Sequence, residues 1–151
     1  MQCTTSNCIE FQSYHTNPTN RMIHVLSFLT ALAAITVLLK TASIFLMIPY
    51  FLFILLMWRS IPLILYMISM YICLCLVVAI IVLQTPEQYK VPLLIVIIIL
   101  TYIFPELSHI YFNEPTYLYN RIYRENNLFT ALYELITHAF NIVPFCLINV
   151  F

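Results

Sequence analysis

The chain has 151 residues, of which 63% are hydrophobic and only 8% are charged. Soluble globular domains carry about 25% charged residues, so this composition excludes an ordinary soluble protein and predicts an integral membrane protein. The formal net charge is zero, which gives no electrostatic reason to expect nucleic acid as a partner. The chain contains no glycine, and this excludes a glycine-rich phosphate-binding loop.

Four apolar runs predict four helices, so the expected fold is an all-α, multi-pass membrane helical bundle. The runs are residues 22–39, 42–57, 60–83 and 92–104. Thr19 or Asn20 is the expected N-cap of the first helix, and prolines at 62 and 92 are expected in the first turns of the third and fourth. A helix needs about 20 residues to cross a membrane, so the shorter runs leave two arrangements open: four crossings or two hairpins.

The character of the chain changes after the fourth run. Residues 105–127 mix acidic and basic side chains with aromatic rings, which is typical of a segment at the membrane interface. Residues 128–151 predict a C-terminal helix that is interfacial or partly inserted. With a polar N-terminal segment (1–21) and the apolar helices (22–104), these make a single membrane domain over the whole chain.

The four histidines all lie outside the middle of the apolar runs. An even number of crossings, or two hairpins, brings His15, His24 and His109 to one face of the membrane. His138 joins them if the last helix packs back beside the first. Neutral imidazole is the commonest metal ligand in proteins, so the histidines predict a site for iron or zinc at this face.

Three glutamates accompany the histidines, as further ligands or as hydrogen-bond acceptors behind them: Glu106, Glu114 and Glu134. Glu106 lies three residues before His109 and Glu134 lies four before His138, so each pair shares a face wherever the backbone is helical. The alternative interpretation is that the histidines are ordinary interfacial side chains with solvated acidic neighbours. The chain has no H-x-x-H or C-x-x-C pattern that would decide the matter.

The distribution of basic residues predicts the orientation of the chain. If all four helices cross, four arginines fall on the histidine side and two lysines on the other, namely Arg21, Arg59, Arg121 and Arg124 against Lys40 and Lys90. Basic residues favour the cytoplasmic face, so the histidine side is expected to be cytoplasmic.

Two segments resemble a known family. Residues 14–24, YHTNPTNRMIH, resemble the H-x-N-P-x-N-R-x-x-H start of the Mpo-type family of membrane 2-hydroxy fatty acid dioxygenases. Residues 108–116, SHIYFNEPT, resemble the histidine-bearing segment that follows the fourth apolar run in that family. Ser27 and Ser108 stand where the family usually has glycine. The order of the segments and the hydropathy between them also agree with the family.

The resemblance implies an Fe(II)-dependent enzyme of the endoplasmic reticulum membrane that uses O₂ to shorten 2-hydroxy fatty acids by one carbon. It implies four iron ligands, His15, His24, His109 and His138. Arg21 lies one turn from the second of these and is expected either to pair with the substrate carboxylate or to serve only as a topology-setting cation. Glu114 is the second candidate catalytic residue.

Two other classes of function stay open. In the first class, the chain is a non-enzymatic membrane adaptor or assembly protein whose histidines have no joint role. In the other it is a membrane lipid hydrolase that uses zinc-activated water.

Overall fold

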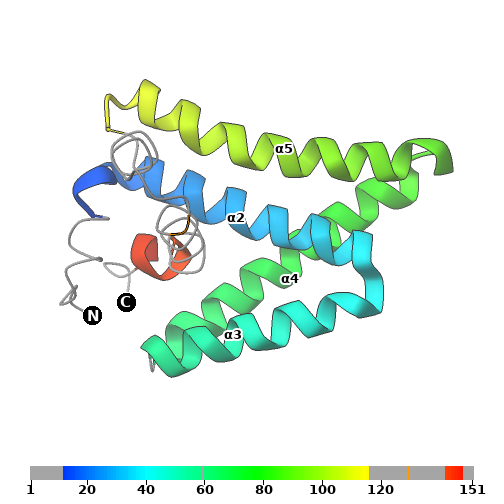
Figure 1. The fold of residues 1–151 in the computed structure, drawn as a ribbon, viewed down its shortest axis with the longest axis horizontal. Coiled ribbons are helices and arrows are strands. Elements are labelled where there is room, and N and C mark those ends of the chain that lie inside the picture. The colour runs from blue at the N-terminus through cyan, green and yellow to red at the C-terminus, as the bar shows by residue number, and fades with distance from the viewer. Residues whose placement is uncertain (1–11, 59, 116–128, 130–141, 148–151) are drawn as a thin grey trace. The chain divides into compact units, whose positions relative to one another are not determined.

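A computed structural model describes residues 12–58, 60–115, 129 and 142–147. The elements in these ranges are helices (Figure 1): α2 (Pro18–Leu39), the 3₁₀ helix η1 (Lys40–Ser43), α3 (Ile44–Trp58), α4 (Ile61–Gln84) and α5 (Glu87–Tyr111). Three of them, α2, α4 and α5, are long and apolar enough to cross a membrane. Helix α3 is also apolar but shorter. The prediction of an all-α membrane bundle with four apolar helices is therefore confirmed.

Helices α2 and α5 are longer than the apolar runs that predict them. α2 has 22 residues and α5 has 25, which correspond to about 33 and 37 Å of helix against about 30 Å of hydrocarbon. The prediction that the fourth helix covers only 92–104 is wrong, because Pro92 and Pro105 both lie inside α5. An apolar helix of this length keeps enough other backbone hydrogen bonds to tolerate both prolines. α3, with 15 residues, is about 22 Å long and falls short of a full crossing.

The N-cap of α2 is Asn17, and the prediction of Thr19 or Asn20 is wrong. The Asn17 side-chain oxygen accepts the backbone N–H of Thr19 at 2.8 Å and that of Asn20 at 3.4 Å. Pro18 then fills the first helical position, where the missing N–H of proline costs nothing. The prediction of a proline in the first turn of α4 is confirmed, and Ser60 is the N-cap of this helix.

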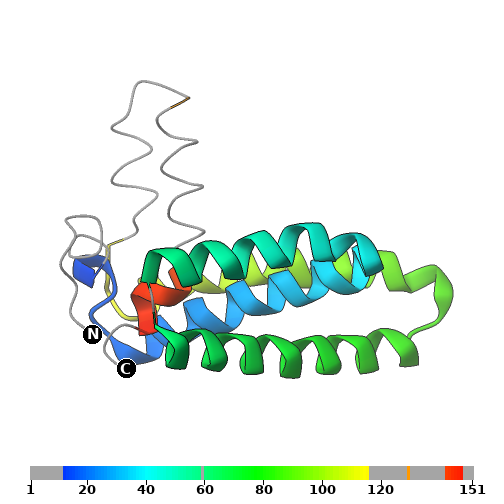
Figure 2. The same ribbon diagram turned by 90° about the horizontal axis from the view of Figure 1, so that it is seen from below.

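The chain divides into two compact units, and unit 2 is Leu26–Ile103. Its core joins three helices: Ala33 and Ala34 of α2 pack with Val78 and Val82 of α4 and with Leu94 of α5. The two alanines allow close approach of the helix backbones, a task that small residues perform in membrane bundles. Within the same unit, α3 contacts α4, and Figure 2 shows both helices running along the length of the unit.

Unit 1 contains the described residues of Met1–Val25 and Phe104–Phe151. It therefore includes the start of α2, the end of α5 and residues 142–147, which are helical and buried. The predicted interfacial segment 105–127 begins inside α5, and its residues beyond 115 lie outside the described part of the chain. Only residues 129 and 142–147 of the predicted last helix are described, and both stretches are helical.

Candidate metal centre

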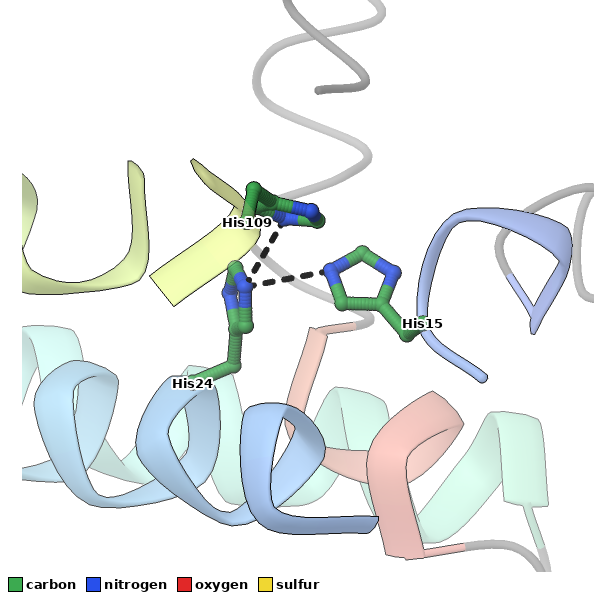
Figure 3. Close-up of side chains that lie close together, drawn as sticks. All are labelled: His15, His24 and His109. Carbon is green, nitrogen blue, oxygen red and sulfur yellow. Dashed lines mark hydrogen bonds between the residues drawn. The ribbon is translucent and has the colours of Figure 1, made fainter. Parts of the chain in front are cut away.

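Three of the four histidines converge in unit 1, although they come from three separate backbone segments (Figure 3). His15 lies in the segment just before α2, His24 in the second turn of α2, and His109 near the end of α5. Their exposed fractions are 0%, 4% and 2%. The prediction that the folded chain brings these three residues to one place is confirmed.

The imidazole rings face one another through their Nε2 atoms. The Nε2 atom of His24 lies 3.2 Å from that of His15 and 3.1 Å from that of His109. The ring planes are inclined at 70–83° to one another, with centroids 4.4–5.0 Å apart. Two nitrogen ligands of a tetrahedral zinc ion lie about 3.3 Å apart, because each is about 2.0–2.1 Å from the metal. The observed separations therefore fit a shared metal ion.

The hydrogen-bonding capacity of imidazole points the same way. A ring nitrogen has either one proton or one lone pair, so the His24 Nε2 atom can make one good hydrogen bond in the plane of its ring. Here it has two nitrogen neighbours at hydrogen-bond distance. A metal ion between the rings would accept a lone pair from each histidine and remove this conflict.

His15 is held in place through its backbone. Its N–H donates to the carbonyl of Gln12 at 3.2 Å, which closes the short helical turn of residues 12–14. Its carbonyl accepts a 2.6 Å hydrogen bond from the Nε atom of Arg21, and the neighbouring Thr16 carbonyl lies 3.4 Å from the Arg21 Nη2 atom. Arg21 therefore fastens the His15 segment to the first turn of α2.

His109 belongs to the last turn of α5, which ends in a Schellman motif. The Glu114 N–H donates to the His109 carbonyl at 2.9 Å, and the Asn113 N–H donates to the Ile110 carbonyl at 3.3 Å. Asn113 has a φ of 54°, the left-handed conformation that this motif requires. The motif turns the chain back, so that Glu114 lies over the helix end that carries His109.

The Glu114 carboxylate joins this helix end to the His15 segment. It accepts hydrogen bonds from the Thr16 hydroxyl and the Asn17 N–H, both at 2.6 Å, and from the Asn20 side-chain amide. Burial by itself raises the pKa of Glu114, but these donors stabilise the charged form and leave the pKa below its ordinary value. Glu114 is therefore a structural anion beside the three histidines.

A buried amide and a buried hydroxyl complete the arrangement. Asn20 is fully buried, and its side chain donates to Glu114 and accepts from the Ser108 hydroxyl. Ser108 is also buried and lies 2.6 Å from the carbonyl of Pro105, one turn earlier in α5. Both polar side-chain atoms of Asn20 are thus used in linking α2 to the end of α5.

The remaining predicted residues have different places. Among the described residues, the candidate ligand group consists of the three histidines, and neither Glu106 nor Glu114 belongs to it. The Glu114 carboxylate accepts hydrogen bonds from Thr16, Asn17 and Asn20, and its role as a candidate catalytic residue stays a prediction. His138 and Glu134 lie outside the described residues, so a fourth histidine ligand stays a prediction.

Sequence analysis missed the linking role of Asn20 and Ser108. Ser108 has no signal of its own, because its partner lies 88 residues away in the chain. The Asn17-Pro18 pair did carry a signal for the start of α2, since asparagine is a favoured N-cap and proline a favoured first residue. That start, in turn, places Asn20 and His24 on one face of the helix.

Comparison of the chain with protein-family models, with curated proteins and with solved structures gave no match. The resemblance of residues 14–24 and 108–116 to the membrane dioxygenase family therefore stays a prediction. The class that the fold and the histidines define is a helical membrane protein with a buried three-histidine cluster able to hold a metal.

Proposed function

We propose that this chain is an iron(II)-dependent membrane dioxygenase that shortens 2-hydroxy fatty acids by one carbon. The observation that carries the proposal is the convergence of three buried imidazole nitrogens, with separations of 3.1 and 3.2 Å at His24. The choice of iron and of the substrate rests on the resemblance of the two segments to the dioxygenase family. Those two segments are also the ones joined by the hydrogen bonds of Glu114 and Asn20.

Each group in this proposal has a stated task. His15, His24 and His109 would hold the metal, and His138 is the predicted fourth ligand. Bound iron would supply O₂ activation next to a coordinated 2-hydroxy carboxylate. The substrate is an amphiphile that would reach the site from the bilayer, and α5 offers exposed apolar side chains there at Leu107 and Ile110.

A second function is favoured by the donor set itself. The described candidate ligands are three histidines without a carboxylate. Three histidines with an open fourth position form a familiar catalytic zinc site, whereas many Fe(II) oxygenases use two histidines and one carboxylate. A zinc-dependent membrane lipid hydrolase is therefore the alternative, and it differs from the dioxygenase in needing no O₂.

The test combines metal analysis with oxygen consumption. Detergent-purified full-length protein, loaded anaerobically with Fe(II) or Zn(II), is assayed with 2-hydroxypalmitate and with palmitate as the control substrate. We expect bound iron and O₂ uptake with the hydroxy acid only. Hydrolysis of a lipid ester without O₂ uptake would instead indicate the zinc enzyme.

Two variants connect the activity to the histidines. We expect His24→Ala to lose metal and turnover, because it removes the ring whose Nε2 atom lies 3.2 Å from that of His15 and 3.1 Å from that of His109. Thr36→Ala, in unit 2, is the control and should keep both. If the wild-type protein binds neither iron nor zinc, or if His24→Ala turns over normally, the enzyme proposal fails and the adaptor interpretation is favoured. The same assay on His138→Ala tests the fourth ligand.

A further inference from the structure

We infer that Asn20 is a positioning residue of the proposed metal centre, because its side-chain amide fixes the His15 segment and the His109 helix end at the separation that three metal ligands require. The inference rests on the proposed function in one respect, namely that the histidines bind a metal. It adds a residue that contacts no ligand atom of the site and acts through its neighbours.

The place of Asn20 in the chain suits this task. It lies four residues before His24, so the two side chains leave the same face of α2. It is fully buried, where leaving the donor or the acceptor of an amide without a partner destabilises the folded protein. Its two ends are both satisfied, by Glu114 on the donor side and by Ser108 on the acceptor side.

Both partners of Asn20 adjoin His109. Ser108 is its neighbour in α5, and the Glu114 N–H is bonded to the His109 carbonyl. The other oxygen of the Glu114 carboxylate accepts from Thr16 and Asn17, which follow His15 in the chain. One continuous set of hydrogen bonds therefore runs from the segment of His15, through Asn20 on the helix of His24, to the helix end of His109.

The direction of these hydrogen bonds gives a sharp way to test them. Asn20→Asp turns the donating end of the side chain into an oxygen that faces the Glu114 carboxylate. Glu114→Gln presents an NH₂ group to the NH₂ group of Asn20. The double variant exchanges donor and acceptor: the new amide at position 114 would donate to the new carboxylate at position 20 and keep its oxygen for Thr16 and Asn17. The carboxylate would still offer Ser108 an acceptor, and the net charge equals that of the wild type.

The measurement is titration of the metal-free, detergent-solubilised full chain with Co(II), followed by the absorption bands of the bound ion. We expect Asn20→Asp and Glu114→Gln each to weaken Co(II) binding by about 10- to 100-fold, the range found when residues behind metal ligands are changed. The added charge of Asn20→Asp would by itself attract the cation, so weaker binding in that variant isolates the effect of geometry. The double variant should recover to within about threefold of wild type, because the two changes are strongly coupled.

Matched controls make the same chemical changes at exposed positions. Gln88→Glu turns an exposed side-chain amide into a carboxylate, and Glu87→Gln removes a carboxylate from a side chain paired with Lys90. Both should bind Co(II) as the wild type does.

Wild-type affinity in Asn20→Asp, or a double variant no better than the weaker single variant, would overturn the inference. If Asn20→Asp does not fold, the double variant decides: folding with recovered binding supports the inference, and failure to fold overturns it.

His24→Ala separates this inference from the proposed function. If the wild type and His24→Ala bind Co(II) equally, the metal centre itself is absent and the proposed function fails. If binding depends on His24 but the exchanged pair does not recover it, the proposed function stands and the role of Asn20 is wrong.

Discussion

At the scale of single residues, Asn113 does in this chain what glycine does at many helix ends. The chain has no glycine, yet the end of α5 requires a left-handed residue. Asparagine is the side chain best able to replace glycine there, since it tolerates that conformation better than most residues. The residue thereby sets the turn that brings Glu114 back over His109.

Substitution of Asn113 tests this interpretation. Asn113→Val should lower the free energy of unfolding by about 1–2 kcal/mol, because a β-branched side chain is strained at positive φ. Asn113→Gly should leave stability unchanged or slightly higher. Chemical denaturation in detergent measures both. Ile110→Val is the control at an exposed helical position of α5, and a loss there as large as in Asn113→Val would contradict the explanation.

Glu114 predicts a dependence of stability on pH. Its pKa in the folded protein lies below the ordinary value of 4.5, so the unfolded chain binds a proton more readily. The stabilisation by the carboxylate is therefore present above about pH 5 and is lost as the pH falls through the folded pKa. We expect the difference in unfolding free energy between wild type and Glu114→Gln to be constant near neutral pH and to shrink in acid. A difference that is the same at about pH 3 as at about pH 6 would contradict this.

At the scale of helices, one polar contact joins α2 to α4 inside the apolar bundle of unit 2. The Thr36 hydroxyl donates to the Leu32 carbonyl at 2.8 Å and lies 2.5 Å from the Tyr71 hydroxyl. Since the Thr36 proton is used within its own helix, Tyr71 is the donor between the helices. The apolar contacts of the alanines and valines beside it have no preferred direction. The hydrogen bond does have one, and it therefore fixes the register of the two helices.

A double-mutant cycle with Thr36→Val and Tyr71→Phe measures that contact. Hydrogen bonds between helices in membranes contribute about 0.6 kcal/mol on average and up to about 1.7. We expect a coupling energy in this range from unfolding titrations in bicelles, and unchanged Co(II) binding at the histidines. Additive effects of the two substitutions would show that the hydroxyl pair contributes nothing to helix pairing.

At the scale of the whole molecule, α2 and α5 contact each other within each of the two units. In unit 1 the start of α2 is hydrogen-bonded to the end of α5 through Asn20 and Ser108. In unit 2 the later part of α2 packs with the early part of α5, since Ala33 and Ala34 share a buried core with Leu94. The chain that leaves the histidine side along α2 therefore returns to it along α5.

Labelling of single cysteines tests this topology. In a background without native cysteines, Ser13→Cys and Pro115→Cys should react with an impermeant maleimide from one side of the membrane and Gln88→Cys from the other. All three positions are exposed. The excess of arginine predicts that the histidine side is cytoplasmic. Reaction of Ser13→Cys and Pro115→Cys from opposite sides would contradict an even number of crossings.

The coarse features can be predicted from the sequence, for physical reasons that particular residues illustrate. Apolar length predicts the number of helices, and parity predicts that His15 and His24 meet His109. Helix ends are less predictable: Pro92 is typical of a helix start, although here an apolar helix continues through it. The first helix begins four residues before its apolar run, because Asn17 and Pro18 form its cap.

The hydrogen bonds behind the histidines cannot be predicted from local patterns. Glu114 bonds to residues 94–98 positions away, and Ser108 bonds to one 88 positions away. Spacing along the chain says nothing about such pairs until the helix ends are placed. Arg21 illustrates the same limit, since its backbone contact with His15 depends on a turn whose shape is set by Asn17.

The separation of the three histidines along the chain also determines when the site is made during synthesis. His15 and His24 are only nine residues apart, whereas His109 follows His24 by 85 residues. A nascent chain that has inserted α2, α3 and α4 presents two imidazoles and no closed cluster, and the third arrives only when α5 has crossed. If the three histidines bind a metal as proposed, its capture would follow the insertion of α5, and chains truncated before α5 are expected to remain metal-free in the membrane.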